Sequence, residues 1–314
     1  MKITINSSLT TFKLLFNDFL TSCKAKGLSE KTLQSYASHL KCFGKYLDLD
    51  TPIEDLTQKH IEEMVNKMRD KGLSPNTIQS YLRTMASFFS WCRRNGLYTP
   101  HIAQYRGVEV IKDTYTDEEL KRLLKKPNLK ECSFSEYRNW VIINLFLDCG
   151  CRSATIRAIE IRDVDLVKGM VAYRHTKSRK VQILPLSSMM VSILQEYLRI
   201  RRGNPEDKLF CSIEGEPMTE SCLKSAIRDY NLRRGVRKTS CHLFRHSYAK
   251  RFLLDCGGDA FALQHILGHS TLAMTKHYCN IYDADLLNNY NELSPLAKLS
   301  GVGSIKKADI QKRR

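Results

Sequence analysis

Two short motifs in the sequence contain arginine and histidine side chains that could bind a phosphate. Gly150 interrupts a long apolar helix, and Arg152 falls where the next helix begins. Backbone N–H groups at the start of a helix attract anions, and a guanidinium beside them offers forked donors to phosphate oxygens. Farther along, His242 and Arg245 lie three residues apart and share one face of a helix that Ser240 can N-cap. Each motif alone also fits an ordinary structural role.

A third motif joins a helix end to a tyrosine. Gly268 can end one helix, His269 then lies in the joint, and Tyr278 follows nine residues later on a short helix expected over 271–279. A free tyrosine, with a pKa of about 10, is only about 0.1% phenolate at pH 7. A nucleophilic tyrosine at this position would therefore need a neighbouring group to accept its proton.

A cationic segment lies between two expected strands, 170–174 and 181–184, which are predicted to pair as a hairpin. Its tip carries Lys177, Arg179 and Lys180. A charged hairpin tip is ordinarily a solvated turn, but three cations on such an arm could also reach into a DNA groove.

Metal chemistry is a competing interpretation of the same histidines. His242 and His246 are four residues apart, as are His265 and His269, a spacing that zinc sites use. However, no Glu follows the first histidine, and Arg245 inside such a site would repel a dication. Three acidic pairs could in principle bind magnesium but do not adjoin the basic motifs: Asp48/Asp50, Asp163/Asp165 and Asp283/Asp285. We therefore expect no metal.

A repeat organises the N-terminal third of the chain. Gly27-Leu-Ser-Glu-Lys-Thr-Leu-Gln-Ser-Tyr36 recurs 45 residues later as Gly72-Leu-Ser-Pro-Asn-Thr-Ile-Gln-Ser-Tyr81. Each copy has a glycine that can end one helix and a serine, Ser29 or Ser74, that can cap the next. Residues 8–95 are accordingly expected to form a compact four-helix domain, with helices near 8–26, 29–47, 57–71 and 74–95.

The remainder is expected to form a larger, mostly helical domain over residues 113–300. Residues 96–112 lack periodicity and are interpreted as a linker, and a capping box at Thr116–Glu119 opens the second domain. The expected helices are near 117–126, 135–149, 187–202, 219–234, 241–255, 259–267 and 271–279. Residues 301–314 form a basic tail, which is either solvated or in contact with DNA.

The composition favours a polyanionic partner. The 314 residues carry 50 Lys and Arg against 33 Asp and Glu, a net charge of +17 that indicates nucleic acid first and an anionic membrane surface second. An apolar fraction of 42% excludes a disordered chain. There is no apolar run of membrane-spanning length and no signal peptide, and the 11 cysteines contain no C-x-x-C. These features predict a cytoplasmic protein.

Taken together, the ordered motifs resemble those of the tyrosine recombinase (phage integrase) family. Leu267-Gly-His-Ser270 with Tyr278 nine residues past the histidine is the most specific part, and His242-x-x-Arg245 strengthens it. The resemblance implies a helical core-binding, SAM-like domain at 8–95 and a catalytic domain at 113–300. The implied activity is site-specific DNA recombination of the integrase or transposase type. With few residues before the first helix, the chain resembles the short, Xer-like architecture.

The resemblance also assigns roles. Arg152, Arg245, His242 and His269 would bind the phosphate oxygens, Tyr278 would attack, and His242 is our candidate base. The hairpin lysine of the family, here Lys177, would protonate the leaving 5′ oxygen. The 3′-phosphotyrosyl link that results stores the bond energy, so that the reaction needs neither ATP nor a metal. One departure is Thr155, because the family usually has Glu or Asp at that position.

Binding of double-stranded DNA would use both domains. Candidate contacts are Lys31, Thr32, Asn76, Thr77 and Arg83 on the helices that start at Ser29 and Ser74, with Arg179 and Lys180 at the hairpin. In the family, a segment equivalent to 283–300 docks on a neighbouring protomer in a tetramer; packing on its own domain is the alternative. Two other functions remain open, namely a non-catalytic DNA-binding protein and a topoisomerase with the same chemistry.

Overall fold

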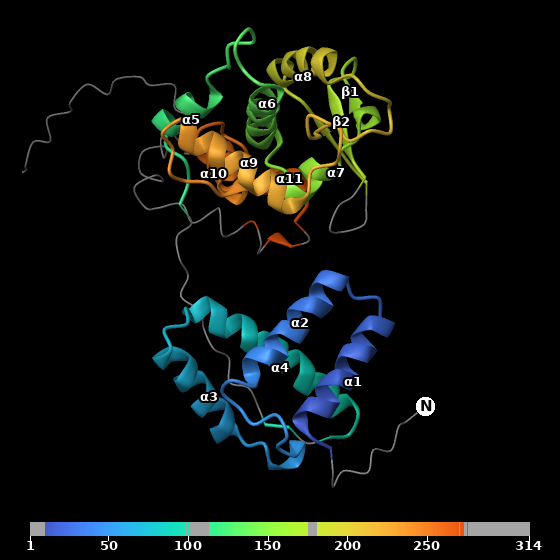
Figure 1. Cartoon of the computed structure of the whole chain (residues 1–314), viewed down its shortest axis with the longest axis vertical. Helices are drawn as coiled ribbons and strands as arrows, with labels where there is room; N and C mark the ends of the chain where they lie inside the picture. The colour runs from blue at the N-terminus through green and yellow to red at the C-terminus, as the bar shows by residue number, and fades with distance from the viewer. Residues whose placement is uncertain are drawn as a thin grey trace, which may run out of the picture. The chain divides into compact units, whose positions relative to one another are not determined.

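The computed structural model describes residues 10–97, 99–100, 113–174, 181–269, 271–272 and 275. The chain divides into two compact units, residues 1–111 and 112–314 (Figure 1). Each unit has its own hydrophobic core. The expected fold class, a small helical domain followed by a larger and mainly helical one with a little β-structure, is confirmed.

The N-terminal unit contains the four expected helices. They are α1 (Phe12–Ala25), α2 (Glu30–Phe43), α3 (Gln58–Asp70) and α4 (Pro75–Arg94), with a 3₁₀ turn, η2, at Ile53–Asp55. Aromatic rings fill the core between α1, α2 and α4: the Phe12 and Phe88 centroids are 5.0 Å apart, and Phe16 and Phe88 are equally close. Burial of these rings, together with the aliphatic side chains around them, stabilises this small unit.

The sequence repeat is a repeat of structure. Gly27 and Gly72 have φ of 73° and 75°, the left-handed conformation that glycine adopts readily, and each ends its helix. Two residues later, Ser29 and Ser74 each accept a backbone N–H at 3.3 Å as N-caps of α2 and α4. The two helices that carry the DNA-contact candidates therefore begin with the same capping geometry.

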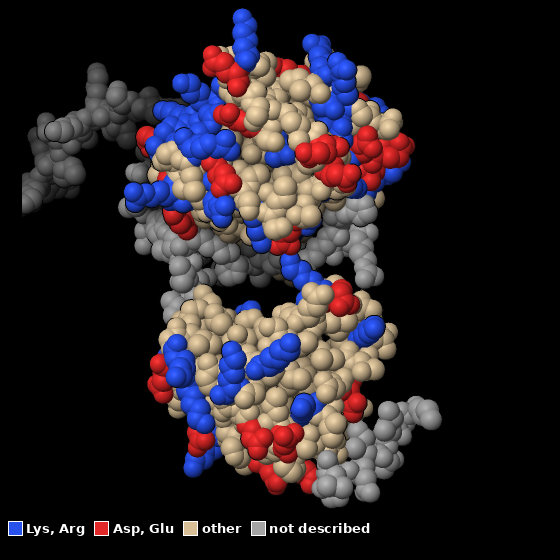
Figure 2. Space-filling model, viewed as in Figure 1, with Lys and Arg blue, Asp and Glu red and all other residues tan. Residues whose placement is uncertain are grey.

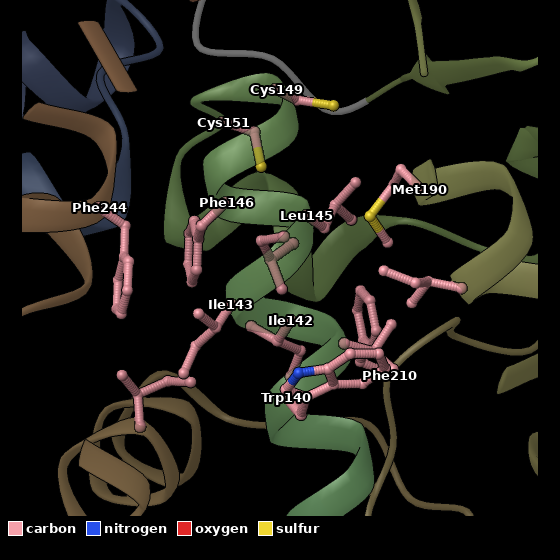
Figure 3. Close-up of a cluster of buried hydrophobic side chains, with 14 of the residues drawn as sticks. Trp140, Ile142, Ile143, Leu145, Phe146, Cys149, Cys151, Met190, Phe210 and Phe244 are labelled. Carbon is pink, nitrogen blue, oxygen red and sulfur yellow. The ribbon is translucent and has the colours of Figure 1, made fainter. Parts of the chain in front are cut away.

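The C-terminal unit is built around one central helix. α6 (Phe134–Cys149) lies between α5 (Asp117–Leu124) and α10 (Cys241–Leu254) on one side and α8 (Ser188–Arg201) with the sheet on the other (Figure 1). It is apolar on nearly all faces, which explains why ten of its residues are buried. Figure 3 shows its side chains packed toward Met190 of α8, Phe210 and Phe244 of α10.

The remaining elements surround this core. They are α7 (Ser153–Ala158), η3 (Ile161–Asp163), α9 (Glu220–Arg233), α11 (Ala260–Leu267), β1 (Val164–Asp165), β2 (Met170–Tyr173) and β3 (Gln182–Pro185). The strands form one antiparallel sheet in the order β1-β2-β3, in which Tyr173 pairs with Gln182. The expected hairpin is confirmed, whereas the two-residue β1 was not expected because so short a strand has no sequence period.

Some expectations fall outside the described residues: most of the helix expected over 271–279, the hairpin tip and the tail. Among the described helices, none has the length and apolarity needed to cross a bilayer. The ten cysteines in the described part of the chain are free thiols, and most are buried.

Candidate active site

A glycine turn at the end of α6 positions Arg152. Gly150 has φ +57°, and its N–H donates to the carbonyl of Phe146 at 2.9 Å. A Cβ at this position would lie 2.3 Å from Cδ1 of Tyr248, so only glycine fits. The chain then reverses, and the half-buried Arg152 becomes the N-cap residue of α7.

A second glycine turn, at the end of α11, positions His269. The N–H of Gly268 donates to the carbonyl of His265 and the N–H of His269 to that of Gln264, both at 3.0 Å. These two bonds, with Gly268 at φ +61°, define a Schellman motif. The motif directs the chain away from α11 at His269, where the sequence placed the joint.

The guanidinium of Arg245 connects the two turns. Nη1 donates to the carbonyl of Gly150 and Nη2 to the carbonyl of Leu267, each at 2.9 Å, and Nη2 also lies 2.8 Å from Nε2 of His269. Arg245 is 4% exposed. A buried guanidinium is stable only when its donors are satisfied, and here carbonyls at two helix ends satisfy them.

The side chain of Arg152, which follows the Gly150 turn, extends toward the Gly268 turn. A Cβ on Gly268 would lie 3.9 Å from its Nη1. The structure therefore brings together Arg152, Arg245 and His269, three residues that are far apart in sequence. We call this group the cationic cradle.

His242 lies on the first turn of α10, one turn before Arg245. Its side chain is exposed, and its N–H donates to Oγ of the N-cap Ser240 at 3.3 Å. The expected cap and the shared helix with Arg245 are therefore present. Phe244 secures this end of α10 by stacking on Phe146 with ring centroids 5.7 Å apart.

Two buried thiols adjoin the cradle without adding negative charge. Burial raises the pKa of Cys151 to about 12, although the Arg245 charge acts in the opposite direction. Burial likewise raises the pKa of Cys149 well above its usual value. Both side chains are neutral at physiological pH, so they do not compete with an incoming phosphate for the guanidiniums.

Sequence reasoning missed two side chains that support the cradle. Oγ1 of Thr275, which is fully buried, lies 2.8 Å from Nδ1 of His269. Nε2 of Gln182 on β3 donates to the carbonyls of His265 and Ile266 in the last turn of α11. The Gln182 contacts join residues 83 and 84 positions apart in the chain and leave no local sequence signal. Thr275 is only six residues from His269, but a spacing of six is no recognised side-chain pairing, so it was not picked out.

The acidic pairs have structural partners. Oδ1 of Asp163 accepts from Nε of Arg174, and Oδ1 of Asp48 accepts the N–H of Asp50 at 3.0 Å. No group of three or more potential metal ligands occurs within the described residues. Asp283/Asp285 lie outside them.

The predicted contacts of the N-terminal unit differ in their surroundings. Lys31, Asn76 and Arg83 are exposed. The hydroxyls of Thr32 and Thr77 lie 2.8 Å from Oγ of the two N-cap serines, so they already take part in helix capping. Figure 2 shows Lys and Arg spread over the visible face of both units.

Several predicted site residues lie outside the described part of the chain. They are Lys177, Arg179, Lys180, Tyr278 and the segment 283–300. Thr155 is described: it is buried in α7, one turn after Arg152.

Comparisons with known protein families identify relatives for both units. Residues 114–285 match the phage integrase family, and residues 15–103 match the family described as phage integrase, N-terminal SAM-like domain. The tyrosine recombinase XerD of Staphylococcus haemolyticus is 30% identical over 284 residues, which cover 87% of this chain and 95% of that protein.

Solved structures have the same fold. The Tn1549 transposon integrase in complex with transposon right end DNA matches with a TM-score of 0.74 at 18% identity, over 90% of this chain and 99% of that one. A lambda integrase tetramer bound to a Holliday junction matches with a TM-score of 0.70 at 19% identity, over 86% and 78% of the two chains.

Proposed function

The chain belongs to the phage integrase family of tyrosine recombinases, and from this premise we propose how its own residues carry out the reaction. It is a site-specific DNA recombinase, an enzyme that cleaves and rejoins DNA strands. We assign nucleophilic attack to Tyr278, whose Oη forms a bond to the scissile phosphorus as the P–O5′ bond breaks. A 3′-phosphotyrosyl link results, and attack by a 5′ hydroxyl of another strand reverses the step.

The observation that supports this assignment best is the cationic cradle. As the tyrosine adds, negative charge grows on the nonbridging oxygens, and donors that are already in place stabilise it without reorganisation. Arg152 and Arg245 supply permanent forked donors, and His269 is positioned beside them. Because Arg245 is buried and held by two helix ends, its donors are pre-positioned for the transition state.

Proton transfers complete the proposal. His242 takes the proton of Tyr278, since it is exposed on the same helix as Arg245 and is therefore accessible to a phenol. Lys177 gives a proton to the leaving O5′. Thr155 stands where the family resemblance leads us to expect an acid, so position 155 itself supplies no negative charge beside Arg152.

We further propose the domain limits 8–95, 96–112, 113–300 and 301–314, with both the first and the third domain binding duplex DNA. The N-terminal unit would contact DNA through Lys31, Thr32, Asn76, Thr77 and Arg83. The hairpin would contact DNA through Arg179 and Lys180. Contacts to phosphates would make binding steeply dependent on salt. We place this activity in the cytoplasm.

Self-association on DNA is assigned to the segment 283–300. Its apolar side chains need a surface to cover them, and the catalytic unit offers a cavity of about 400 Å³ between α5, α6 and α10. Its apolar lining includes Leu120, Leu124, Leu147, Tyr248 and Phe252. Docking of one protomer's segment in its neighbour's cavity would link four copies in a ring, consistent with the tetrameric form of the lambda integrase relative.

A suicide substrate tests the proposed chemistry. The DNA is a duplex selected from a random library by binding to the full chain, then nicked near its centre so that the cleaved end diffuses away. Wild-type protein should give a DNA-linked band on a denaturing gel, with the link mapped to Tyr278. Tyr278→Phe should bind the same duplex and give no band; a band from this variant overturns the assignment. Relaxation of supercoiled DNA without exchange between duplexes would indicate a topoisomerase instead.

A further inference from the structure

The residues on either side of the hairpin tip are both anchored to other parts of the catalytic unit. Arg174 follows the last residue of β2, and Gln182 is the first residue of β3. Between them lie residues 175–180, which include Lys177. The positions of these two anchors therefore set where the lysine-bearing segment leaves the sheet and where it returns.

The first anchor is an ion pair. Nε of Arg174 lies 2.5 Å from Oδ1 of Asp163, and the other oxygen of Asp163 accepts the N–H of Glu160 at 3.0 Å. The Asp163 side chain is 2% exposed. A carboxylate buried to this extent requires its partners, so the pair fixes the end of β2 against η3.

The second anchor reaches the cradle itself. The carboxamide of Gln182 donates from Nε2 to the carbonyls of His265 and Ile266, the latter at 3.1 Å. Its Oε1 lies over Gly268, where a Cβ would be 3.1 Å away. The next carbonyl, that of Leu267, accepts from Arg245. Gln182 and Arg245 thus bind successive carbonyls at one helix end.

Packing alone does not hold the start of β3. Val181 and Ile183, on either side of Gln182, are 58% and 60% exposed. Apolar burial of these neighbours is small, whereas the Gln182 side chain connects this strand end to α11 through two hydrogen bonds.

We propose that Gln182 is a positioning residue: it ties the start of β3, the strand that follows the Lys177 segment, to the Gly268–His269 turn, so that proton donation to the leaving oxygen and phosphate binding act on the same linkage. This inference rests on the proposed function, in which Tyr278 attacks phosphorus, the P–O5′ bond breaks, and a proton passes from the Lys177 ammonium to O5′. Arg245 and the two backbone bonds of the Schellman motif would still hold the Gly268–His269 turn without Gln182, so loss of the Gln182 bonds would chiefly misplace the proton donor.

A sulfur substrate separates this role from a general structural one. When the bridging 5′ oxygen is replaced by sulfur, the leaving group is a thiolate that departs without receiving a proton. A variant that is defective only in proton donation should then cleave at nearly the wild-type rate, whereas a variant with a defective cradle should remain slow. The probe is the selected duplex with a 5′-bridging phosphorothiolate at the mapped scissile position, compared with its oxygen counterpart.

The variants are Gln182→Ala and Gln182→Glu, the second being nearly isosteric but unable to donate to the two carbonyls. Ile183→Ala, on the same strand and exposed, is the matched control. Both Gln182 variants should cleave the oxygen substrate about 10- to 100-fold more slowly and the sulfur substrate within about threefold of wild type, because a small misplacement of a reacting group has effects of this size. Ile183→Ala should match wild type on both substrates.

Reference variants separate the two hypotheses. Lys177→Ala should be slow on oxygen and rescued by sulfur; if it is not, the role of Lys177 in the proposed function fails, and that of Gln182 with it. Arg245→Lys should be slow on both substrates. If Lys177→Ala is rescued but the Gln182 variants are equally slow on both substrates, or normal on both, the positioning role of Gln182 is wrong and the proposed function stands.

Discussion

Nη2 of Arg245 lies 2.8 Å from Nε2 of His269, and this contact fixes which nitrogen of the histidine carries the proton. An arginine only donates, so Nε2 must accept. The proton is then on Nδ1, which donates to Oγ1 of Thr275 at 2.8 Å. Without substrate, Arg245 and Thr275 therefore hold His269 from both sides in its neutral form. An incoming phosphate oxygen would compete for the Arg245 donor.

Removing the hydroxyl of Thr275 should free the His269 ring to reorient while leaving the packing around residue 275 unchanged. Thr275→Val keeps the branched side chain in its buried site but loses the acceptor for Nδ1–H. We expect cleavage of the suicide substrate to slow about tenfold, since an orienting hydrogen bond is lost from a group that acts on the reacting phosphate. DNA affinity, measured by gel shift, should stay within about twofold. Thr275→Ser retains the hydroxyl and should cleave at nearly the wild-type rate; equal rates for Val and Ser would contradict the role of this bond.

The Gly150 turn leaves no space for a side chain, and this constraint can be measured as stability. Gly150→Ala adds a Cβ at φ +57° and 2.3 Å from the Tyr248 ring. The strained backbone costs about 1 kcal/mol and the overlap about 1–3 kcal/mol more. Gly169→Ala is the control, because φ is +61° there but the nearest atom is 3.6 Å away. Urea unfolding should show the larger loss for Gly150→Ala, and similar losses would mean that the Tyr248 contact relaxes freely.

Arg245→Lys tests whether the fork matters or only the charge. A lysine ammonium cannot donate to the carbonyls of both Gly150 and Leu267 with the same geometry, so at least one buried acceptor loses its partner. We expect a loss of about 1–3 kcal/mol in the free energy of unfolding and a decrease in cleavage of about 100-fold or more. Arg251→Lys, on the same helix but with partly exposed ion pairs to Asp117 and Asp255, should cost less than about 1 kcal/mol. A lysine at 245 that cleaves at the wild-type rate would show that charge alone suffices.

The helix ends are the part of the fold that the sequence predicted best. Ser29, Ser74 and Thr116 act through bonds to residues three positions away, so their capping roles are local and appear in the sequence. The strand β1 was missed for the opposite reason. Its two residues are too few to display a period, and its position depends on packing against the rest of the unit. The start of α7 at Arg152 was expected, but its six residues were too few to predict where it ends.

The candidate site divides in the same way. Arg152, Arg245 and His269 were found because their residue types and order carry the chemistry. What holds them was not predicted: the Gly150 carbonyl that binds Arg245, and the Gln182 amide that binds α11. These partners are 95 and 84 residues away in the chain. A bond to a main-chain carbonyl leaves no signal in the identity of the residue that supplies it.

Buried thiols should make the protein unfold more easily at alkaline pH. Burial raises the pKa of Cys151 to about 12 and that of Cys241 to about 11, from 9.0 in the unfolded chain. The pKa of each thiol is higher in the folded chain than in the unfolded one. Below pH 9 both states carry neutral thiols, and the full free energy of unfolding is present. As the pH rises from 9 toward 11–12, only the unfolded chain ionises, and this part of the stability is lost. Between these limits each thiol lowers the free energy of unfolding by about 1.4 kcal/mol per pH unit. Urea unfolding at pH 8, 9.5 and 10.5 checks the slope, and Cys241→Ala should reduce it. A free energy that stays constant up to pH 10.5 would mean that these thiols ionise as readily in the folded chain as in the unfolded one.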